Sequence, residues 1–302
     1  YVWFDALLDY VSGVGFADDR RRWDTFWPAD VHVIGKDITR FHAIYWPAML
    51  MAAEEELPKR IFAHGFINLR GEKLSKTSGV VVDPLQLAEE FGADAIRYTL
   101  LREVPFDRDG DFSMEAFQNR YNADLANDLG NLVNRTANMI KRYFGGVIPQ
   151  PSPAAAAEGR VRVPSSNDLD PLDRELISAG EAVVRDLAPL MEALDFSNAL
   201  VAIWAYIGRA NQYLERTSPW LLARDDANRL RLETVLNAAA EAVRLITYLV
   251  LPFMPGTAKR IASQLGFALT GEEGWERWGQ LPPGTQVGDV EPLFPRIDRD
   301  AG

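Results

Sequence analysis

Three short apolar segments, rich in β-branched and aromatic residues, begin at near-equal intervals in the first part of the chain. They start at Tyr1, Val31 and Ile61 and read YVWF, VHVIG and IFAHGFINL. Between the second and third, apolar residues recur at helical spacing within residues 38–56: Phe41, Ile44, Tyr45, Ala48, Met49 and Ala52. This pattern predicts strand, helix, strand units and a parallel sheet, with Tyr1 inside a buried strand. Ligands bind such sheets where strands end, which points to Asp5 and to residues 35–37.

From about residue 85 onward the pattern of apolar positions becomes helical. The predicted helices span residues 84–102, 114–143, 172–193, 196–217, 226–250 and 256–265. Residues 149–171 are rich in proline, alanine and small polar residues and favour a surface connection. Residues 270–302 contain many prolines and glycines but also Trp275, Trp278, Leu293, Phe294 and Ile297. We therefore expect a helical bundle and a tail that packs back on it.

Composition narrows the possible functions. The 302 residues favour two domains, and 47% hydrophobic with 25% charged residues is typical of globular proteins. Without cysteine there is no disulfide or thiolate metal site, and three scattered histidines suggest no zinc or other metal centre. The longest apolar stretch, Leu245 to Met254, is too short to cross a membrane. A chain that opens inside a predicted strand, without Met, is expected to be part of a longer protein.

A loop bounded by glycines is the first candidate for chemistry. It reads GEKLSKTSG from Gly71 to Gly79 and contains Lys73 and Lys76 three positions apart. Ammonium and hydroxyl groups in a glycine-bounded loop suit a polyphosphate that gains charge during a reaction. A solvated hairpin is the competing interpretation.

Aromatic residues near two predicted strand ends form the second candidate. Trp3, Tyr10, Phe41 and His42 could line one apolar pocket, with the carboxylates of Asp5 and Asp37 at its mouth. Such a pocket suits a small apolar amine, and a thioether makes favourable contacts with aromatic rings, so methionine is a reasonable guest. An ordinary core with a structural histidine is the alternative.

A stripe of asparagines is the third candidate. At 100° per residue, Asn127, Asn131, Asn134 and Asn138 fall within about 60° of one another on a helix. The apolar residues of the opposite face are Leu125, Leu129, Leu132, Val133 and Ile140. Because asparagine is a poor helix former, a solvated face would normally use Glu and Lys.

Single-stranded RNA is the ligand that suits this stripe, because each carboxamide offers a donor and an acceptor to base edges. Because the formal net charge of −11 repels nucleic acid, such a contact must rest on a locally basic segment. Residues 120–142 provide one, with four basic and two acidic side chains. The guanidinium of Arg135 can donate paired hydrogen bonds to a phosphate or base, and Trp220 offers a stacking surface. A polar helix face with a buried tryptophan is the alternative.

In order along the chain, these motifs resemble those of the class I methionyl-tRNA synthetases of bacterial type. The resemblance covers nearly the whole sequence, through YVWFDALLDY, HVIGKDITRFHAIYWPAMLMAA, GEKLSKTSG, GADAIRYTLLREVPFDRDGDFS and PLFPRI. It implies an α/β region followed by an all-α region. The implied domains are the second half of a Rossmann-like nucleotide-binding domain (1–110), a helical anticodon-binding domain (111–270) and a tail (271–302).

Carried over residue by residue, the resemblance assigns three sites. The implied methionine pocket consists of Trp3, Ala6, Tyr10, Ile38, Phe41 and His42. The implied ATP site consists of Gly35, Asp37 and the KMSKS-type loop Lys73, Leu74, Ser75, Lys76 and Thr77, with Asp37, Lys73 and Lys76 as catalytic residues. The implied anticodon-binding residues are Asn127, Asn131, Arg135, Pro219 and Trp220. Leu74 and Thr77 depart mildly from the commonest Met and Ser of the family, and Leu7 stands where some members have Pro.

The implied function is ATP-dependent activation of methionine and its transfer to tRNA(Met) in the cytoplasm, with Mg²⁺ accompanying ATP. The family's first half, with its HIGH signature, has no counterpart here, so we expect this chain alone to be incomplete for catalysis and to need that half as a partner. Two alternatives are a class I synthetase for isoleucine, leucine or valine, and a non-catalytic tRNA-binding module.

Overall fold

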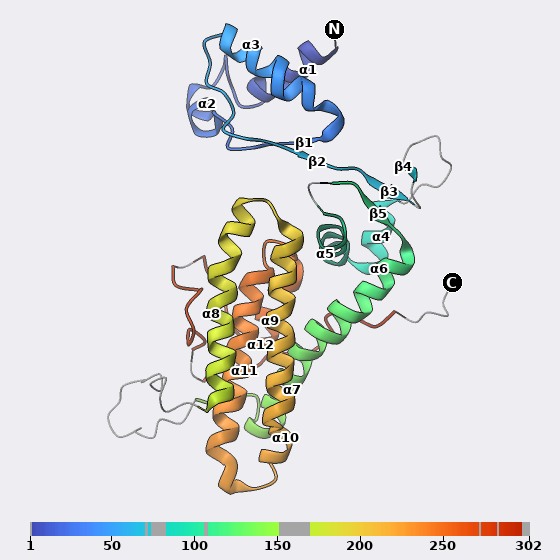
Figure 1. Cartoon of the computed structure of the whole chain (residues 1–302). Helices are drawn as coiled ribbons and strands as arrows, with labels where there is room; N and C mark the ends of the chain where they lie inside the picture. Colours follow the sequence, from blue (N-terminus) through green and yellow to red (C-terminus); the bar gives the residue numbers. More distant parts are fainter. Residues whose placement is uncertain are drawn as a thin grey trace. The chain divides into compact units, whose positions relative to one another are not determined.

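A computed structural model describes residues 2–69, 72–73, 83–105, 108–150, 170–271, 273–282 and 284–297, and only the backbone of residues 69, 72 and 73. The chain divides into two compact units, one from residues 1–78 and 104–111 and the other from residues 79–103 and 112–302. The expected order of small sheets with helices, followed by a helical region, is confirmed (Figure 1).

The first unit combines short helices with two small sheets. Its helices are α1 (Val2–Ser12), α2 (Arg20–Phe26), the 3-10 turn η1 (Lys36–Ile38), the π-helix η2 (Phe41–Tyr45) and α3 (Trp46–Ala52). The strands are β1 (His32–Gly35), β2 (Ile61–His64), β3 (Ile67–Leu69), β4 (Glu72–Lys73) and β5 (Gly110–Phe112). β1 and β2 are parallel, with His32 opposite Ile61 and Gly35 opposite His64, as the strand, helix, strand pattern predicts. β4, β3 and β5 form a separate sheet.

The prediction of a buried strand at the start of the chain is wrong, because residues 2–12 form the helix α1. Leu7 and Val11 are buried at helical spacing, whereas Val2 is 80% and Phe4 56% exposed. Four consecutive apolar residues are compatible with a short strand and with a helix. Here the apolar repeat that continues through Leu7 and Val11 favours the helix. The described part of the chain therefore pairs two parallel strands rather than three.

The segment predicted as one long strand from Ile61 is divided at Gly65 into β2 and β3. A Cβ atom on Gly65 would lie 2.2 Å from the backbone of Arg108, so only glycine fits at this close approach. Phe66 then accepts a hydrogen bond from the Gly110 N–H at 2.9 Å, which connects β3 to the β5 segment.

The second unit is helical, and the helical stretches predicted from periodicity are confirmed with small changes. Its main helices are α4 (Pro84–Phe91), α5 (Ala93–Glu103), α6 (Met114–Arg120), the π-helix η3 (Tyr121–Gly130), α7 (Asn131–Phe144), α8 (Pro171–Glu192), α9 (Phe196–Thr217), α11 (Arg229–Val250) and α12 (Pro255–Leu265). Between α9 and α11 lie α10 (Pro219–Leu222) and the 3-10 turn η5 (Asp226–Asn228). The connection predicted at residues 149–171 lies mostly outside the described residues.

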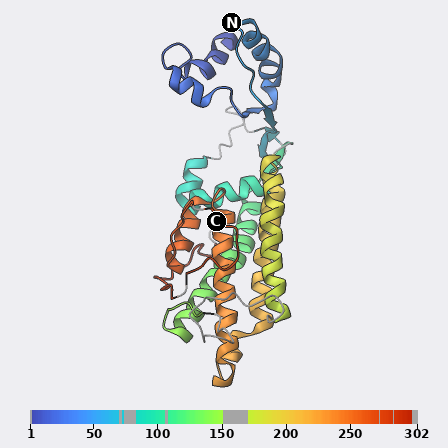
Figure 2. The same cartoon turned by 90° about the vertical axis from the view of Figure 1, so that its left-hand side faces the viewer.

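The long helices α8, α9 and α11 run side by side, as Figure 1 and Figure 2 show, and α11 is buried along most of its length. Asp170 and Asp195 start α8 and α9 by accepting hydrogen bonds from backbone N–H groups of the first turn. Residues 84–103 pack with this unit, because Tyr98 donates to Asp124 at 2.5 Å and Ser197 donates to the Arg102 carbonyl at 3.0 Å.

The C-terminal stretch packs on the helical unit. In Figure 2 it is the dark red segment beside the orange helices. The buried carboxylate of Glu241 accepts the N–H groups of Gly279, Gln280 and Leu281 at 2.8–3.0 Å. Arg244, itself 3% exposed, pairs with Glu241 and donates to the carbonyls of Trp275 and Arg277. Among the helices that the structure describes, none is long and apolar enough to cross a membrane.

Candidate functional site

An aromatic cluster occupies the middle of the first unit. Leu7, Val11, Trp23, Trp27, Trp46 and Leu50 form its buried core. Trp3 and Tyr10 of α1 and Phe41 of η2 pack on this core while remaining partly exposed. The rings of Trp3 and Phe41 stack at 4.5 Å between centroids with an interplanar angle of 13°. Two helices far apart in sequence thus present a common ring surface.

A hydrogen-bonded chain runs behind this ring surface. The His42 Nδ1 atom lies 3.0 Å from the Ile38 carbonyl oxygen, and its Nε2 lies 2.9 Å from the Tyr10 hydroxyl. Because a carbonyl only accepts, Nδ1 carries the proton and Nε2 accepts from Tyr10. Burial raises the pKa of Tyr10, which keeps this hydroxyl a donor. Both ring nitrogen atoms of His42 are therefore engaged in hydrogen bonds.

A second histidine supports the cluster and was not singled out from the sequence. Trp46 donates its indole N–H to His32 Nε2 at 3.3 Å, and the Tyr10 ring lies 4.3 Å from the His32 ring. Burial, with a smaller contribution from nearby His42, lowers the pKa of His32. Trp46 lies four residues after His42 on the predicted helix, and this spacing could have added Trp46 to the predicted site.

An apolar cavity of about 400 Å³ opens on this unit. Its lining residues are Trp3, Phe4, Leu7, Phe41, Tyr45, Ala48, Met49 and Ala52. Of the six residues predicted for a methionine pocket, Trp3 and Phe41 line it, and Tyr10, Ile38 and His42 form the hydrogen-bonded chain behind them. Ala6 lies on α1 between Trp3 and Tyr10, on the same helix face. The structure thus brings Trp3, Tyr10, Phe41 and His42 together.

The end of β1 forms an exposed polar corner. A Cβ atom on Gly35 would lie 2.8 Å from the Asp37 carboxylate oxygen, so the absence of a side chain at Gly35 makes room for that carboxylate. Lys36 forms an ion pair with Asp109 at 2.7 Å and lies 5.1 Å over the Phe66 ring. Asp37 therefore remains exposed at the carboxyl end of a parallel strand, where ligands of such sheets bind.

The predicted KMSKS-type loop is largely beyond what the structure describes. The Lys73 backbone belongs to β4, but its side chain and the residues Leu74, Ser75, Lys76 and Thr77 lie outside the described residues. Their assignment to ATP stays a prediction.

The asparagine stripe predicted on one helix face lies on η3 and α7 of the second unit. Asn127, Asn131 and Asn138 are exposed and Asn134 is half-buried, with Asn138 donating to Asn134 at 2.9 Å. On the opposite face Leu125, Leu129, Leu132, Val133 and Ile140 are each 0% exposed. The predicted division of faces is confirmed, although the π-helical turn of residues 121–130 was not foreseen.

Arg135 joins this face to the other predicted RNA-binding segment. Its guanidinium lies 5.4 Å over the Trp220 ring and forms an ion pair with Glu215 at 2.6 Å. Pro219, the residue before Trp220, is buried, while Trp220 itself is half-buried. The helix α7 contains Arg135, Lys141 and Arg142 and no acidic residue. Exposed carboxamides, a cation and an indole ring therefore share one surface of this unit.

Comparisons with known proteins identify the family of both regions of the chain. Residues 1–137 match a family model described as tRNA synthetases class I (M), and residues 163–301 match the anticodon binding domain of methionyl tRNA ligase. The chain is 48% identical to a Methionine--tRNA ligase of Caldanaerobacter subterraneus subsp. tengcongensis and 44% identical to one of Halalkalibacterium halodurans. Each alignment covers 99% of this chain but only 45% and 44% of the relative.

A solved structure gives the same result. The chain matches a Mycobacterium tuberculosis methionyl-tRNA synthetase in complex with methionyl-adenylate, with a TM-score of 0.89 and 42% identity. That alignment covers 98% of this chain and 56% of the solved chain. The chain thus spans under half the length of the curated relatives it matches, and it belongs to the class I methionyl-tRNA synthetase family.

Proposed function

We propose that this chain is part of a methionine–tRNA ligase, which joins methionine to ATP, releases pyrophosphate and transfers the methionyl group to tRNA(Met) in the cytoplasm. Residues 1–110 supply the second half of the nucleotide-binding domain, residues 111–270 bind the anticodon, and residues 271–302 form the tail. Because the chain spans under half of its relatives' length, this activity belongs to the full-length protein, in which a further catalytic half is the partner.

Methionine fits the ring surface of the first unit. A thioether gains favourable contacts at the edges of aromatic rings such as Trp3 and Phe41, at about 0.3–1.5 kcal/mol each. Tyr10 and His42 use their polar atoms on each other, so they present an apolar boundary to the side chain of the substrate. Ala6 and Ile38 complete the proposed pocket with small and branched apolar groups.

ATP is proposed to bind at the polar corner and the adjacent loop. Asp37, exposed beside Gly35, would accept hydrogen bonds from the adenosine or the ammonium group. Lys73 and Lys76 would stabilise the charge that develops on the phosphates, and catalysis would rest on positioning and charge stabilisation. Mg²⁺ would accompany ATP and be held mainly by the substrate phosphates.

One observation supports the tRNA part of the proposal most strongly. The guanidinium of Arg135 lies over the Trp220 ring, and Arg135 is on the same helix as the exposed Asn131. Unpaired bases need a stacking surface and hydrogen-bond partners for their edges, and this surface offers both. The absence of acidic residues from α7 favours a polyanion locally, despite the net charge of −11.

Two measurements test the proposal. The 302-residue chain should bind an RNA hairpin carrying the methionine anticodon more tightly than a hairpin with an altered anticodon. The full-length protein should catalyse methionine-dependent exchange of pyrophosphate into ATP. Equal binding of both hairpins would contradict the anticodon assignment. Stronger exchange with isoleucine, leucine or valine would favour another synthetase of the class, and hairpin preference without exchange would favour a non-catalytic tRNA-binding module.

A further inference from the structure

Trp220 lies in a short connection between two long helices. Helix α9 ends at Thr217, Ser218 adopts a left-handed backbone with φ of 45°, and the four-residue α10 follows. Helix α11 begins at Arg229. A four-residue helix is too short to be stable alone, so the position of Trp220 depends on how its two flanks are held.

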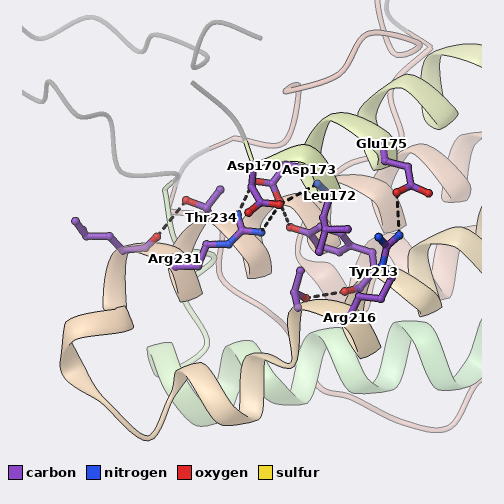
Figure 3. Close-up of polar contacts among 10 residues, drawn as sticks. Asp170, Leu172, Asp173, Glu175, Tyr213, Arg216, Arg231 and Thr234 are labelled. Carbon is purple, nitrogen blue, oxygen red and sulfur yellow. Dashed lines mark hydrogen bonds and ion pairs between the residues drawn. The ribbon is translucent and has the colours of Figure 1, made fainter. Parts of the chain in front are cut away.

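One buried carboxylate holds both flanks. Asp173 of α8 is only 1% exposed, and its Oδ1 accepts a hydrogen bond from the Tyr213 hydroxyl at 2.6 Å. Its Oδ2 accepts from the Arg231 guanidinium at 2.5 Å. Tyr213 lies in the last turns of α9 and Arg231 in the first turn of α11, and Figure 3 shows Asp173 between them. The carboxylate therefore ties the end of one helix and the start of the next to α8.

Further contacts continue this network toward Trp220. Thr217 donates its hydroxyl to the Tyr213 carbonyl at 2.7 Å, and Ser218 donates to the Glu215 carbonyl at 2.8 Å, which closes the end of α9. On the surface, Arg216 pairs with Glu175 of α8 at 2.9 Å (Figure 3). Glu215, in the same turn, is the residue that pairs with Arg135.

The pairing around Asp173 is needed for this region to keep its geometry. A carboxylate taken out of water is stabilised only when its partners are in place, and removing one leaves an uncompensated buried charge. Asp170 adds to the arrangement, because it caps α8 through the Leu172 N–H at 2.9 Å and lies 3.7 Å from Arg231. Burial raises the pKa of Tyr213 well above its ordinary value, so its hydroxyl stays a donor.

We propose that Asp173 is a positioning residue for RNA recognition, which acts by fixing the segment that presents Trp220 to Arg135. Asp173 is buried beneath the surface and acts through Tyr213 and Arg231, without contacting RNA itself. This inference rests on the proposed function of the surface that contains Asn131, Arg135 and Trp220.

The test compares two buried carboxylates in the 302-residue chain. Asp173→Asn keeps the size and an oxygen acceptor but removes the charge that holds Arg231. It should weaken binding of the methionine-anticodon hairpin about tenfold, and its preference over the altered hairpin should fall by a similar factor. The matched control is Glu241→Gln, which neutralises a carboxylate that is 2% exposed and paired with Arg244 at the tail. This control should keep both affinity and preference.

A second measurement reports the position of Trp220 directly. The indole N–H resonance of Trp220, assigned with Trp220→Phe, should shift in Asp173→Asn and stay in place in Glu241→Gln. Tyr213→Phe, which removes one hydrogen bond and no charge, should give a smaller shift and serves if Asp173→Asn fails to fold.

The outcomes separate the two proposals. A wild-type chain without hairpin preference contradicts the proposed function. A wild-type chain with preference, combined with unchanged affinity and an unmoved Trp220 resonance in the Asp173 and Tyr213 variants, overturns the positioning role. Equal losses in Asp173→Asn and Glu241→Gln would also overturn it, because they would indicate general loosening of the bundle.

Discussion

The aromatic cluster of the first unit and the asparagine stripe of the second differ in where their polar groups point. Those of the cluster pair with one another inside the unit, whereas those of the stripe face outward. In the first, Tyr10 donates to His42 and Trp46 donates to His32, so the polar atoms satisfy one another and apolar rings line the site. In the second, Asn127 and Asn131 are exposed on a helix whose apolar side is fully buried. A site whose polar atoms pair with one another selects its ligand by shape. A surface with exposed carboxamides selects its ligand by hydrogen bonding.

The two sites also differ in how their residues are held. Ring stacking and side-chain hydrogen bonds fix Trp3, Phe41 and Tyr10 across α1 and η2. The residues proposed to face RNA on η3 and α7 are fixed by their helices and by ion pairs such as Arg135 with Glu215. Changes in either site should therefore affect one partial reaction and leave the other intact.

Replacing Lys76 should have the largest effect and separate the two sites most sharply. Loss of one preorganised group that stabilises developing charge costs about 10²- to 10³-fold in rate. Lys76→Ala in the full-length enzyme should therefore slow pyrophosphate exchange by about that factor, while hairpin binding is unchanged. Lys59→Ala, which removes an exposed lysine paired with Asp30, is the control. Unchanged exchange in Lys76→Ala would refute the role assigned to the loop.

Replacing Trp220 should give the mirror image of that result. Base stacking on an aromatic ring contributes about 1–3 kcal/mol, so Trp220→Ala should weaken hairpin binding by about 5- to 150-fold. tRNA charging should fall while methionine-dependent exchange stays at the wild-type rate. If the unmutated enzyme charges native and anticodon-altered tRNA equally, the case for anticodon reading is lost.

Removing the Tyr10 hydroxyl tests whether its hydrogen bond to His42 shapes the proposed methionine site. A neutral hydrogen bond contributes about 0.5–1.5 kcal/mol, so Tyr10→Phe should raise the KM for methionine by about 2- to 12-fold. Hairpin affinity should not change. Tyr248→Phe, in the helical unit, is the matched control and should leave the KM unaltered. A methionine KM equal to wild type would indicate that the His42 orientation does not matter.

Mild acid should weaken the first unit and spare the second, because all three histidines lie between residues 32 and 64. Burial lowers the pKa of His32 below its ordinary value of 6.5, so the unfolded chain binds a proton more readily than the folded one. The stability that neutral His32 contributes is complete above that value and falls as the pH drops toward the folded pKa, by at most about 1.4 kcal/mol per pH unit.

Hydrogen exchange at pH 7.5 and 5.5, corrected for intrinsic rates, measures this effect. Residues 32–50 should lose protection at the lower pH while α9 does not. His32→Gln keeps an acceptor for Trp46 without titrating, and it should reduce the pH dependence. Equal dependence in the variant would assign the effect to other groups.

Periodicity was sufficient to predict most helices and the burial of one face of α7, because each depends on neighbours within a few turns. It failed at Val2 to Phe4, which were interpreted as part of a strand although the apolar repeat continues through Leu7 and Val11. The sequence also could not reveal the pairing of Asp173 with Tyr213 and Arg231, which joins residues 40 and 58 positions apart. His32 was missed for the same reason, since only the folded chain brings its ring nitrogen to the Trp46 indole.

The absence of acidic residues from α7 affects how a nucleic acid reaches the protein. A chain with a formal net charge of −11 repels a polyanion such as the proposed tRNA over most of its surface. Salt limits that repulsion to a distance of about 8 Å at physiological ionic strength, inside which the local surface governs the encounter. For the RNA ligand proposed above, approaches with α7 foremost would meet the least repulsion, so the negative charge of this chain would favour encounters in that orientation.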